Sequence, residues 1–461
     1  VVFMVSHLGM NEKVANLQYG ATQAWVYAFT FIGGLFADKI LGLRKSLFWG
    51  GILMIIGSVI LAIDPKNFFF IGLGFTIVGT GFFKPNISSM VGQLYPDGDP
   101  RRDAGFSFFY MGVNLGALIG GYICIAVAEG SMWQSIVPEH LRWNVGFGFA
   151  AIVMIISLLT FTQTQKSLGP IGLSPLKEMM VSKRKQLEIV TYVGSLLVIP
   201  LIIVMVANTH YTDYFMICIG PASILYLLYE MKNFTLAENK KLFAALIFII
   251  FSIFFWAFFE QSGGSLSLFA VNNLNNTIGG VVLSPNGVNN SANSFFVIGF
   301  AALVGLVWLW LDKRKIEPNT VIKFGLAFLF LAGGFWVFYY TKFFADGFGR
   351  TSLGIFTFGW FVITLGELCL SPIGMSAMTK LSPSKTQAVI MGMWFLASAY
   401  GQYFAGILGA NIAEASEQSS NIEKLNVYAD GYLQLAIYAL IAGVVLIVLS
   451  PLVRKLMQEV K

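Results

Sequence analysis

The chain has 461 residues, of which 56% are hydrophobic and only 11% are charged. Soluble globular chains carry roughly 25% charged residues, so this composition excludes an ordinary soluble protein. The net charge of +6 does not indicate nucleic-acid binding, because the basic residues lie in short connectors and not on one soluble face. The apolar residues form long runs and not the alternating segments of about ten residues that build membrane β-barrels. We therefore expect an all-α polytopic membrane protein.

Each bilayer crossing needs about 20 apolar residues, and thirteen runs of that kind follow one another along the chain. They lie at 15–36, 46–63, 68–90, 104–128, 144–163, 187–207, 213–230, 242–270, 294–311, 324–341, 352–378, 387–411 and 433–453. Residues 1–8 form an apolar stub that is too short to span a bilayer. We expect this stub to be the end of a first helix whose first half the sequence lacks, which gives fourteen helices.

The connectors between these runs alternate between two sides of the membrane. Most of the 29 Lys and Arg residues fall on one side, and by the positive-inside rule that side is cytoplasmic. Both termini are then predicted to be cytoplasmic. A basic stretch that begins at residue 166 and a second connector near residue 241 divide the chain. We predict a six-helix bundle at 1–165, a linker with two additional helices at 166–241 and a second six-helix bundle at 242–461.

The reactive residue types give no sign of a catalytic or metal centre. The three cysteines fall in separate apolar runs, and the three histidines lie in predicted extracellular connectors. There is no His-x-x-x-His or Cys-x-x-Cys spacing. We expect no metal and no cofactor. A polytopic enzyme and a pure receptor remain as alternatives to a carrier.

The connector at 33–45 reads GGLFADKILGLRK. Small residues let two helices approach closely, the acid ends a helix at the cytoplasmic face, and the bases anchor the connector there. This order of residues resembles the loop signature of the major facilitator superfamily, with one residue more than its commonest spacing. The alternative is an ordinary basic connector.

Three charged residues lie inside the predicted spans and away from their first and last two positions: Lys84, Glu260 and Glu367. A charge at the bilayer centre costs about 2.5 to 3.5 kcal/mol on insertion scales, so intramembrane ionisable residues are functional candidates. The alternative for each is a buried ion pair or a charge at a helix end. For Glu260 the second alternative is concrete, since its run could end near Gly263.

Polar and aromatic residues recur four positions apart within several runs, so that each set shares one helix face. The sets are Tyr19, Gln23 and Tyr27; Tyr110 and Asn114; Trp256 and Glu260; and Trp394 and Ser398. Taken together in so apolar a chain, these faces predict the lining of a polar cavity, although any one pair could serve packing alone.

Four short motifs carry a more specific resemblance. FFKPN at 82–86, FSFFYMGVNLG at 106–116, FEQ at 259–261 and LGEL at 365–368 resemble the signatures of the proton-dependent oligopeptide transporter family, in that family's order. The two additional helices between the halves are also typical of its bacterial members. The resemblance implies a major facilitator fold of two six-helix bundles plus two helices, in a bacterial plasma membrane.

The resemblance also implies roles for individual residues. The lysine that matches Lys84 lies near the peptide carboxylate, the glutamate that matches Glu367 receives the peptide amino group, and the acid that matches Glu260 takes part in proton coupling. Lys84 and Glu367 are further expected to act as a gating pair. The other positions that match the lining of the substrate cavity are Tyr27, Tyr110, Asn114, Trp256, Asn293, Trp394 and Ser398.

The implied function is a proton-coupled symporter that imports di- and tripeptides by alternating access, with peptides, protons and the lipid bilayer as its partners. The alternative is a related carrier for another small solute, such as nitrate, a glucoside or a peptide-like drug. The Glu-x-x-Glu-Arg motif of the family's first helix does not occur in the sequence, and Phe259 stands where some relatives have a second acid. The proton stoichiometry is therefore left open.

Overall fold

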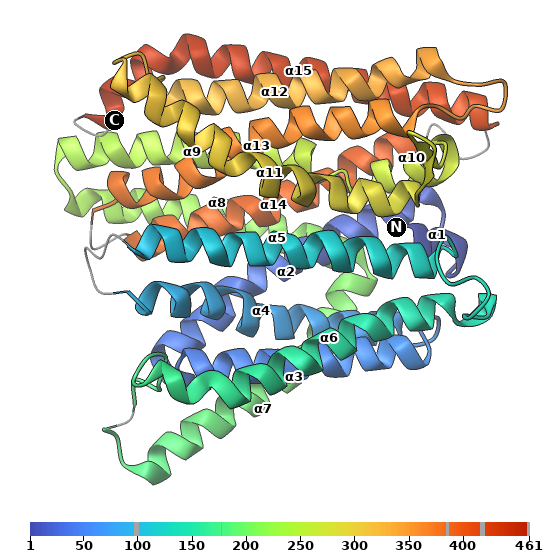
Figure 1. Ribbon diagram of the computed structural model, residues 1–461. Coiled ribbons are helices and arrows are strands. Elements are labelled where there is room, and N and C mark those ends of the chain that lie inside the picture. The colour runs from blue at the N-terminus through green and yellow to red at the C-terminus, as the bar shows by residue number, and fades with distance from the viewer. Residues whose placement is uncertain (96–100, 177, 384–386, 415–419, 459–461) are drawn as a thin grey trace. The chain divides into compact units, whose positions relative to one another are not determined.

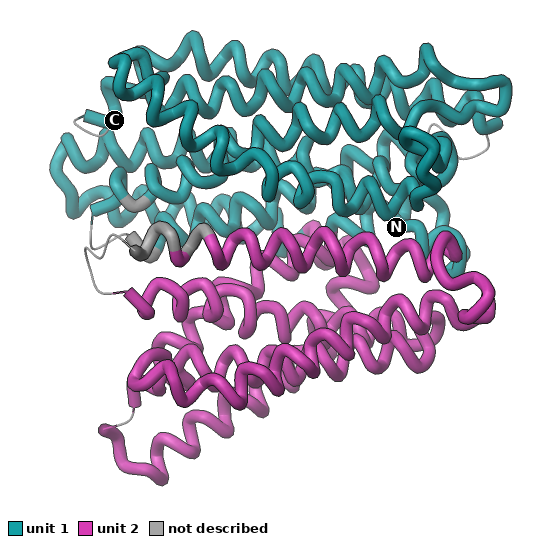
Figure 2. The backbone as a smooth tube through the Cα atoms, viewed as in Figure 1, with its two compact units in different colours: residues 1–20, 214–461 teal, residues 21–213 magenta. Residues whose placement is uncertain are grey.

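The computed structural model describes residues 1–95, 101–176, 178–383, 387–414 and 420–458 (Figure 1). At 101–104, 106–107, 379, 387–388 and 414 it describes the backbone alone. Two compact units make up the chain (Figure 2). Unit 1 contains Val1–Gly20 and Tyr214–Lys461, and unit 2 contains Ala21–Asp213. These limits differ from the three parts expected from the connectors, and that three-part division remains a prediction.

Unit 2 is helical, and its helices pack through small residues. They are the second part of α2 (Glu12–Phe36), α3 (Leu43–Ile63), α4 (Phe69–Gln93), α5 (Arg101–Ala128), α6 (Arg142–Thr164) and α7 (Val181–Ala207). Helix α3 packs against α4 and α6, and α4 also packs against α7. A Cβ atom added to Gly33 of α2 would lie 2.1 Å from the backbone oxygen of Gly81 in α4. Any larger residue at position 33 would therefore force the two helices apart.

The connector at 33–45 folds as a π-helical turn, Ala37–Leu41, followed by Gly42 at φ 78°. A left-handed φ favours glycine because that residue has no Cβ atom. Arg44 then donates from Nε to the carbonyl oxygen of Ile171 and from Nη2 to that of Gly169, both at 2.7 Å. These two hydrogen bonds hold the connector at 33–45 against the connector that follows α6. The local sequence pattern does not reveal this partner.

Unit 1 holds the remaining helices and a short hairpin. They are α1 (Val2–Ser6), the first part of α2, α8 (Thr209–Glu230), α9 (Leu236–Phe259), α10 (Ser265–Asn273), α11 (Pro285–Lys313), α12 (Thr320–Tyr340), α13 (Leu353–Leu381), α14 (Gln387–Glu414), α15 (Asn421–Met457), β1 (Thr277–Ile278) and β2 (Val281–Val282). Helix α12 runs along α13 and α15, and α9 packs against α14 and α15 (Figure 1). Phenylalanine side chains of α9, α12 and α13 fill the core between them.

Each predicted apolar run coincides with one long helix, with one exception. The run at 242–270 is not continuous: α9 ends at Phe259, and α10 begins only at Ser265. Gln261 lies in this break, and its side chain donates to the carbonyl oxygens of Ala257 in α9 and Ala405 in α14, both at 3.1 Å. The expectation of a single long span was wrong there.

Among the described residues, eleven helices are long and apolar enough to span a membrane. The two further predicted runs coincide with α4 and α14, which are less apolar. Helix α4 carries Lys84, Asn86 and two serines in its second half. The protein is therefore an all-α multi-pass membrane protein, as its composition predicted.

Candidate functional site

Glu367 lies in the middle of α13, inside unit 1, and its residue is 8% exposed. The preceding residue, Gly366, allows α12 to come close, because a Cβ atom there would lie 2.6 Å from the backbone oxygen of Ala327. Asn293 of α11 donates from Nδ2 to Oε2 of Glu367 at 2.7 Å. The structure thus brings together two of the predicted site residues, an intramembrane carboxylate and an amide that holds it.

Asn293 belongs to a ladder of polar contacts between α11 and α13. Asn286, Asn289 and Asn293 share one face of α11, and Trp360, Thr364 and Glu367 share one face of α13. Trp360 donates from Nε1 to Oδ1 of Asn289 at 3.3 Å, and Asn293 donates to Oγ1 of Thr364 at 3.2 Å.

Four residues of these two faces, Asn286, Asn289, Trp360 and Thr364, were not predicted as site residues. The signal that could have found the two asparagines is their spacing of three and four residues at the start of a membrane helix. An amide at such a position needs a polar partner, because the bilayer core offers no water.

Trp256 and Glu260 mark the end of α9 in the same unit. Trp256 is half-buried, and its indole N–H is a buried donor with no hydrogen-bond partner among the described residues. Glu260 is the residue that follows the helix, and its backbone N–H donates to the carbonyl oxygen of Trp256 at 3.0 Å. Glu260 is therefore at a helix end, as one of its two interpretations anticipated.

Trp394 and Ser398 lie one turn apart on α14. Trp394 is 5% exposed and meets the ring of Phe324 edge-on, with the centroids 6.5 Å apart. A Cβ atom on Gly374 of α13 would lie 2.3 Å from its indole. Trp394 therefore packs in the core of unit 1, and Ser398 is half-buried. Their predicted role as cavity lining remains untested.

In unit 2, the ammonium group of Lys84 lies over the ring of Tyr27, 4.1 Å from its centroid. The close approach of Gly33 to Gly81 brings α2 against α4 and so places the two side chains together. Lys84 is exposed and Tyr27 half-buried. A cation above an aromatic face gains about 0.5 to 1 kcal/mol at an exposed site and more when it is desolvated. Tyr27 therefore orients this cation and leaves its charge available.

Tyr110 and Asn114 share one face of α5. Tyr110 is 42% exposed and Asn114 only 7%, and Asn114 donates from Nδ2 to the carbonyl oxygen of Tyr110 at 3.0 Å. Of the motif at 106–116, the side chains of Phe106 and Ser107 lie outside the described residues. The predicted gating pair also remains a prediction, because Lys84 belongs to unit 2 and Glu367 to unit 1.

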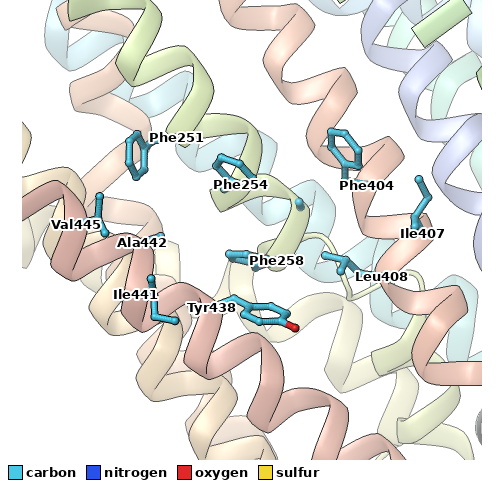
Figure 3. Close-up of a pocket in the computed structure, with 11 residues that line it drawn as sticks. Phe251, Phe254, Phe258, Phe404, Ile407, Leu408, Tyr438, Ile441, Ala442 and Val445 are labelled. Carbon is cyan, nitrogen blue, oxygen red and sulfur yellow. The ribbon is translucent and has the colours of Figure 1, made fainter. Parts of the chain in front are cut away.

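An apolar pocket of about 470 Å³ lies elsewhere in unit 1, between α9, α14 and α15 (Figure 3). Its lining is Phe251, Phe254, Ala257, Phe258, Phe404, Ile407, Leu408, Tyr438, Ile441, Ala442 and Val445. A ligand with two charged ends does not fit these walls, since the single hydroxyl of Tyr438 is their one polar side-chain group. Within the described part of the chain, no group of three or more His, Cys, Asp or Glu residues is placed to hold a metal ion.

Comparison with known proteins decides the family. The family model PTR2, described as the POT family, matches residues 44–427. The chain belongs to the POT family. The peptide transporter YePEPT of Yersinia enterocolitica is 31% identical over 98% of this chain and 88% of its own length. The di-/tripeptide transporter of Lactococcus lactis is 30% identical over 98% of this chain and 89% of its own.

Solved structures of POT transporters agree with the fold. A mutant of peptide transporter POT in complex with alafosfalin aligns with a TM-score of 0.81 at 30% identity, over 98% of this chain and 88% of that one. A POT family transporter in complex with 5-aminolevulinic acid aligns with a TM-score of 0.79 at 27% identity, over 97% and 89%. The family and the major facilitator fold that the four sequence motifs predicted are thereby confirmed.

Proposed function

We propose that this POT family protein is a proton-coupled symporter that imports di- and tripeptides by alternating access. The observation that carries the proposal is the buried carboxylate of Glu367, held by the amide of Asn293 at 2.7 Å inside a membrane-spanning helix. A charge at that depth is costly unless it has a ligand or partner of opposite charge. The ammonium group of a peptide is such a ligand.

Lys84 supplies the opposite charge that a zwitterion requires. Its ammonium group is exposed above the ring of Tyr27, so we assign it to the peptide carboxylate. Tyr110, Asn114, Trp256, Trp394 and Ser398 complete the proposed substrate contacts. The names of several relatives point the same way, since they are called peptide transporters or di- and tripeptide permeases.

Glu260 is assigned to proton coupling. It is an acidic residue directly after α9. In general, a carboxyl group that alternately gains and loses a neighbouring cation during the transport cycle can release and load a proton. The distribution of basic connectors supports an orientation with both termini in the cytoplasm.

The test is uptake of a labelled dipeptide into vesicles that contain the purified protein, with and without an inward proton gradient. Uptake that rises with the gradient and is inhibited by unlabelled di- and tripeptides supports the proposal. Uptake that does not depend on the gradient would contradict the proposed proton coupling. Competition by nitrate, a glucoside or a peptide-like drug, in place of peptides, would favour the alternative carrier.

A further inference from the structure

The hydroxyl group of Thr364 has one proton, and the structure shows where that proton goes. Thr364 Oγ1 lies 2.7 Å from the carbonyl oxygen of Trp360, one turn earlier in α13. A carbonyl oxygen can only accept, so the hydroxyl must donate to it. Thr364 is fully buried. Toward any second partner its oxygen is therefore an acceptor.

That second partner is the side-chain amide of Asn293, 3.2 Å away. An amide has an NH₂ end and a carbonyl end of nearly the same shape, and only the hydrogen-bond network distinguishes them. Here the end that faces Thr364 also faces Oε2 of Glu367. Both neighbours are acceptors, so the NH₂ group, with its two protons, must point at them. Thr364 and Glu367 together fix the orientation of the amide.

The carbonyl end of Asn293 is consequently turned away from both neighbours. Asn293 is half-buried, and its Oδ1 accepts no hydrogen bond from the described residues. An ammonium group has three donors and no acceptor. A site that binds it must therefore present oxygen atoms and no N–H groups. Asn293 Oδ1 belongs to the amide that is bonded to Glu367, so one ammonium can reach both residues.

We propose that Thr364 is a positioning residue for recognition of the peptide amino terminus, which rests on the proposed function. By accepting from Asn293, Thr364 keeps the amide oxygen presented beside the carboxylate of Glu367. Without the hydroxyl group, the amide loses one of the two acceptors that hold it and can rotate its NH₂ group toward the ligand. The NH₂ group would then repel the ammonium.

A purely structural role is the competing interpretation, because threonine in membrane helices commonly bonds the carbonyl oxygen four residues earlier. Helix α13 offers a matched control in Thr357, whose Oγ1 donates to the carbonyl oxygen of Leu353 at 2.8 Å. Thr357 is half-buried on the same helix and has no asparagine at its hydroxyl. Both threonines have the local bond, and only Thr364 has the amide.

The experiment measures binding of one dipeptide and of its N-acetylated form to purified wild type, Thr364→Val, Thr364→Ser and Thr357→Val, together with their melting temperatures. We expect Thr364→Val to weaken binding of the unblocked dipeptide about five- to tenfold, as the loss of one hydrogen bond does, and to change binding of the acetylated form less than twofold. Thr364→Ser retains the hydroxyl and should bind like wild type, as should Thr357→Val.

Equal losses for both ligands, unchanged binding in Thr364→Val, or failure of Thr364→Ser to restore selectivity would each overturn the positioning role. If Thr364→Val does not fold, Thr364→Ala removes the same acceptor with a smaller side chain. The binding results expected for Thr364→Val are then expected for Thr364→Ala. A wild type that binds neither dipeptide would reject the proposed function, and the role of Thr364 with it. A wild type that prefers the unblocked dipeptide, beside an unchanged Thr364→Val, would reject the role of Thr364 alone.

Discussion

The ammonium group of Lys424 lies 2.8 Å from Oε1 of Glu12, and this ion pair joins the first turn of α2 to the first turn of α15 within unit 1. The hydroxyl group of Tyr428 donates to the other oxygen of Glu12 at 2.7 Å. The side chain of Glu12 is 7% exposed and that of Lys424 is 17% exposed. The pair is therefore largely shielded from water, unlike a surface salt bridge.

We expect Lys424→Met to destabilise the protein by about 3 kcal/mol, because it removes one partner of a buried ion pair. The double variant Glu12→Gln with Lys424→Met should recover part of that loss, since neither charge then remains. Thermal unfolding of the purified variants measures both effects. Lys342→Met is the matched control, because it breaks the pair with Asp430, whose side chain is 61% exposed. A control that costs as much as Lys424→Met would contradict the importance of burial.

Lys84→Ala should abolish gradient-driven dipeptide uptake and leave the protein folded. The side chain is exposed above Tyr27, and its removal leaves no buried polar group without a partner. The melting temperature should therefore change little. Uptake by reconstituted vesicles measures the first effect and thermal unfolding the second. Tyr27→Phe keeps an aromatic face under the cation and should retain part of the uptake. Wild-type uptake in Lys84→Ala would refute the assigned role.

Glu260→Gln should reduce proton-driven uptake far more than peptide counterflow, because the amide resembles a carboxyl group that never releases its proton. Counterflow exchanges labelled for unlabelled peptide and needs no net proton movement. The two assays on the same vesicles give the ratio. Glu139→Gln, an exposed glutamate in a short 3-10 helix, is the control and should leave that ratio unchanged. Equal loss in both assays would contradict a role specific to coupling.

Glu367→Gln should weaken binding of an unblocked dipeptide by about tenfold or more relative to the N-acetylated form. A carboxylate facing an ammonium contributes about 1.5 to 3 kcal/mol, and about 1.4 kcal/mol is a factor of ten. The amide of glutamine can still accept from Asn293, so the contact between α11 and α13 should survive. If Glu367 served only to balance Lys84, the variant would instead lower stability and impair both ligands alike.

The sequence was sufficient for the parts of this protein that depend on long segments. Apolar runs of 20 residues predicted the membrane helices, because a bilayer constrains their length. The run at 242–270 was expected as one span, and an end near Gly263 was only an alternative for Glu260. A bond that joins the break to α14 connects Gln261 to Ala405, 144 residues away. Periodicity along one segment carries no information about a partner so distant.

For the candidate site too, the sequence predicted individual residues but not the contacts between distant segments. Asn293 and Glu367 were expected to serve one ligand, and the structure places them in direct contact. That Thr364 holds the same amide could not be read from the chain, because the two residues are 71 positions apart and only the packing of α11 on α13 brings them together. Trp394 was expected on a cavity wall, and the structure gives it a packing partner in Phe324.

The ladder between α11 and α13 has a consequence for how the protein enters the membrane. Asn293 finds its partners Thr364 and Glu367 only in α13, 71 and 74 residues later in the chain. Between the synthesis of the two helices, the side-chain amide of Asn293 would face hydrocarbon without these bonds, which is costly for any polar group. Helix α11 is therefore expected to stay at a hydrated place beside the insertion machinery until α13 has been made. Integration of these two helices would then be a concerted late step of biogenesis.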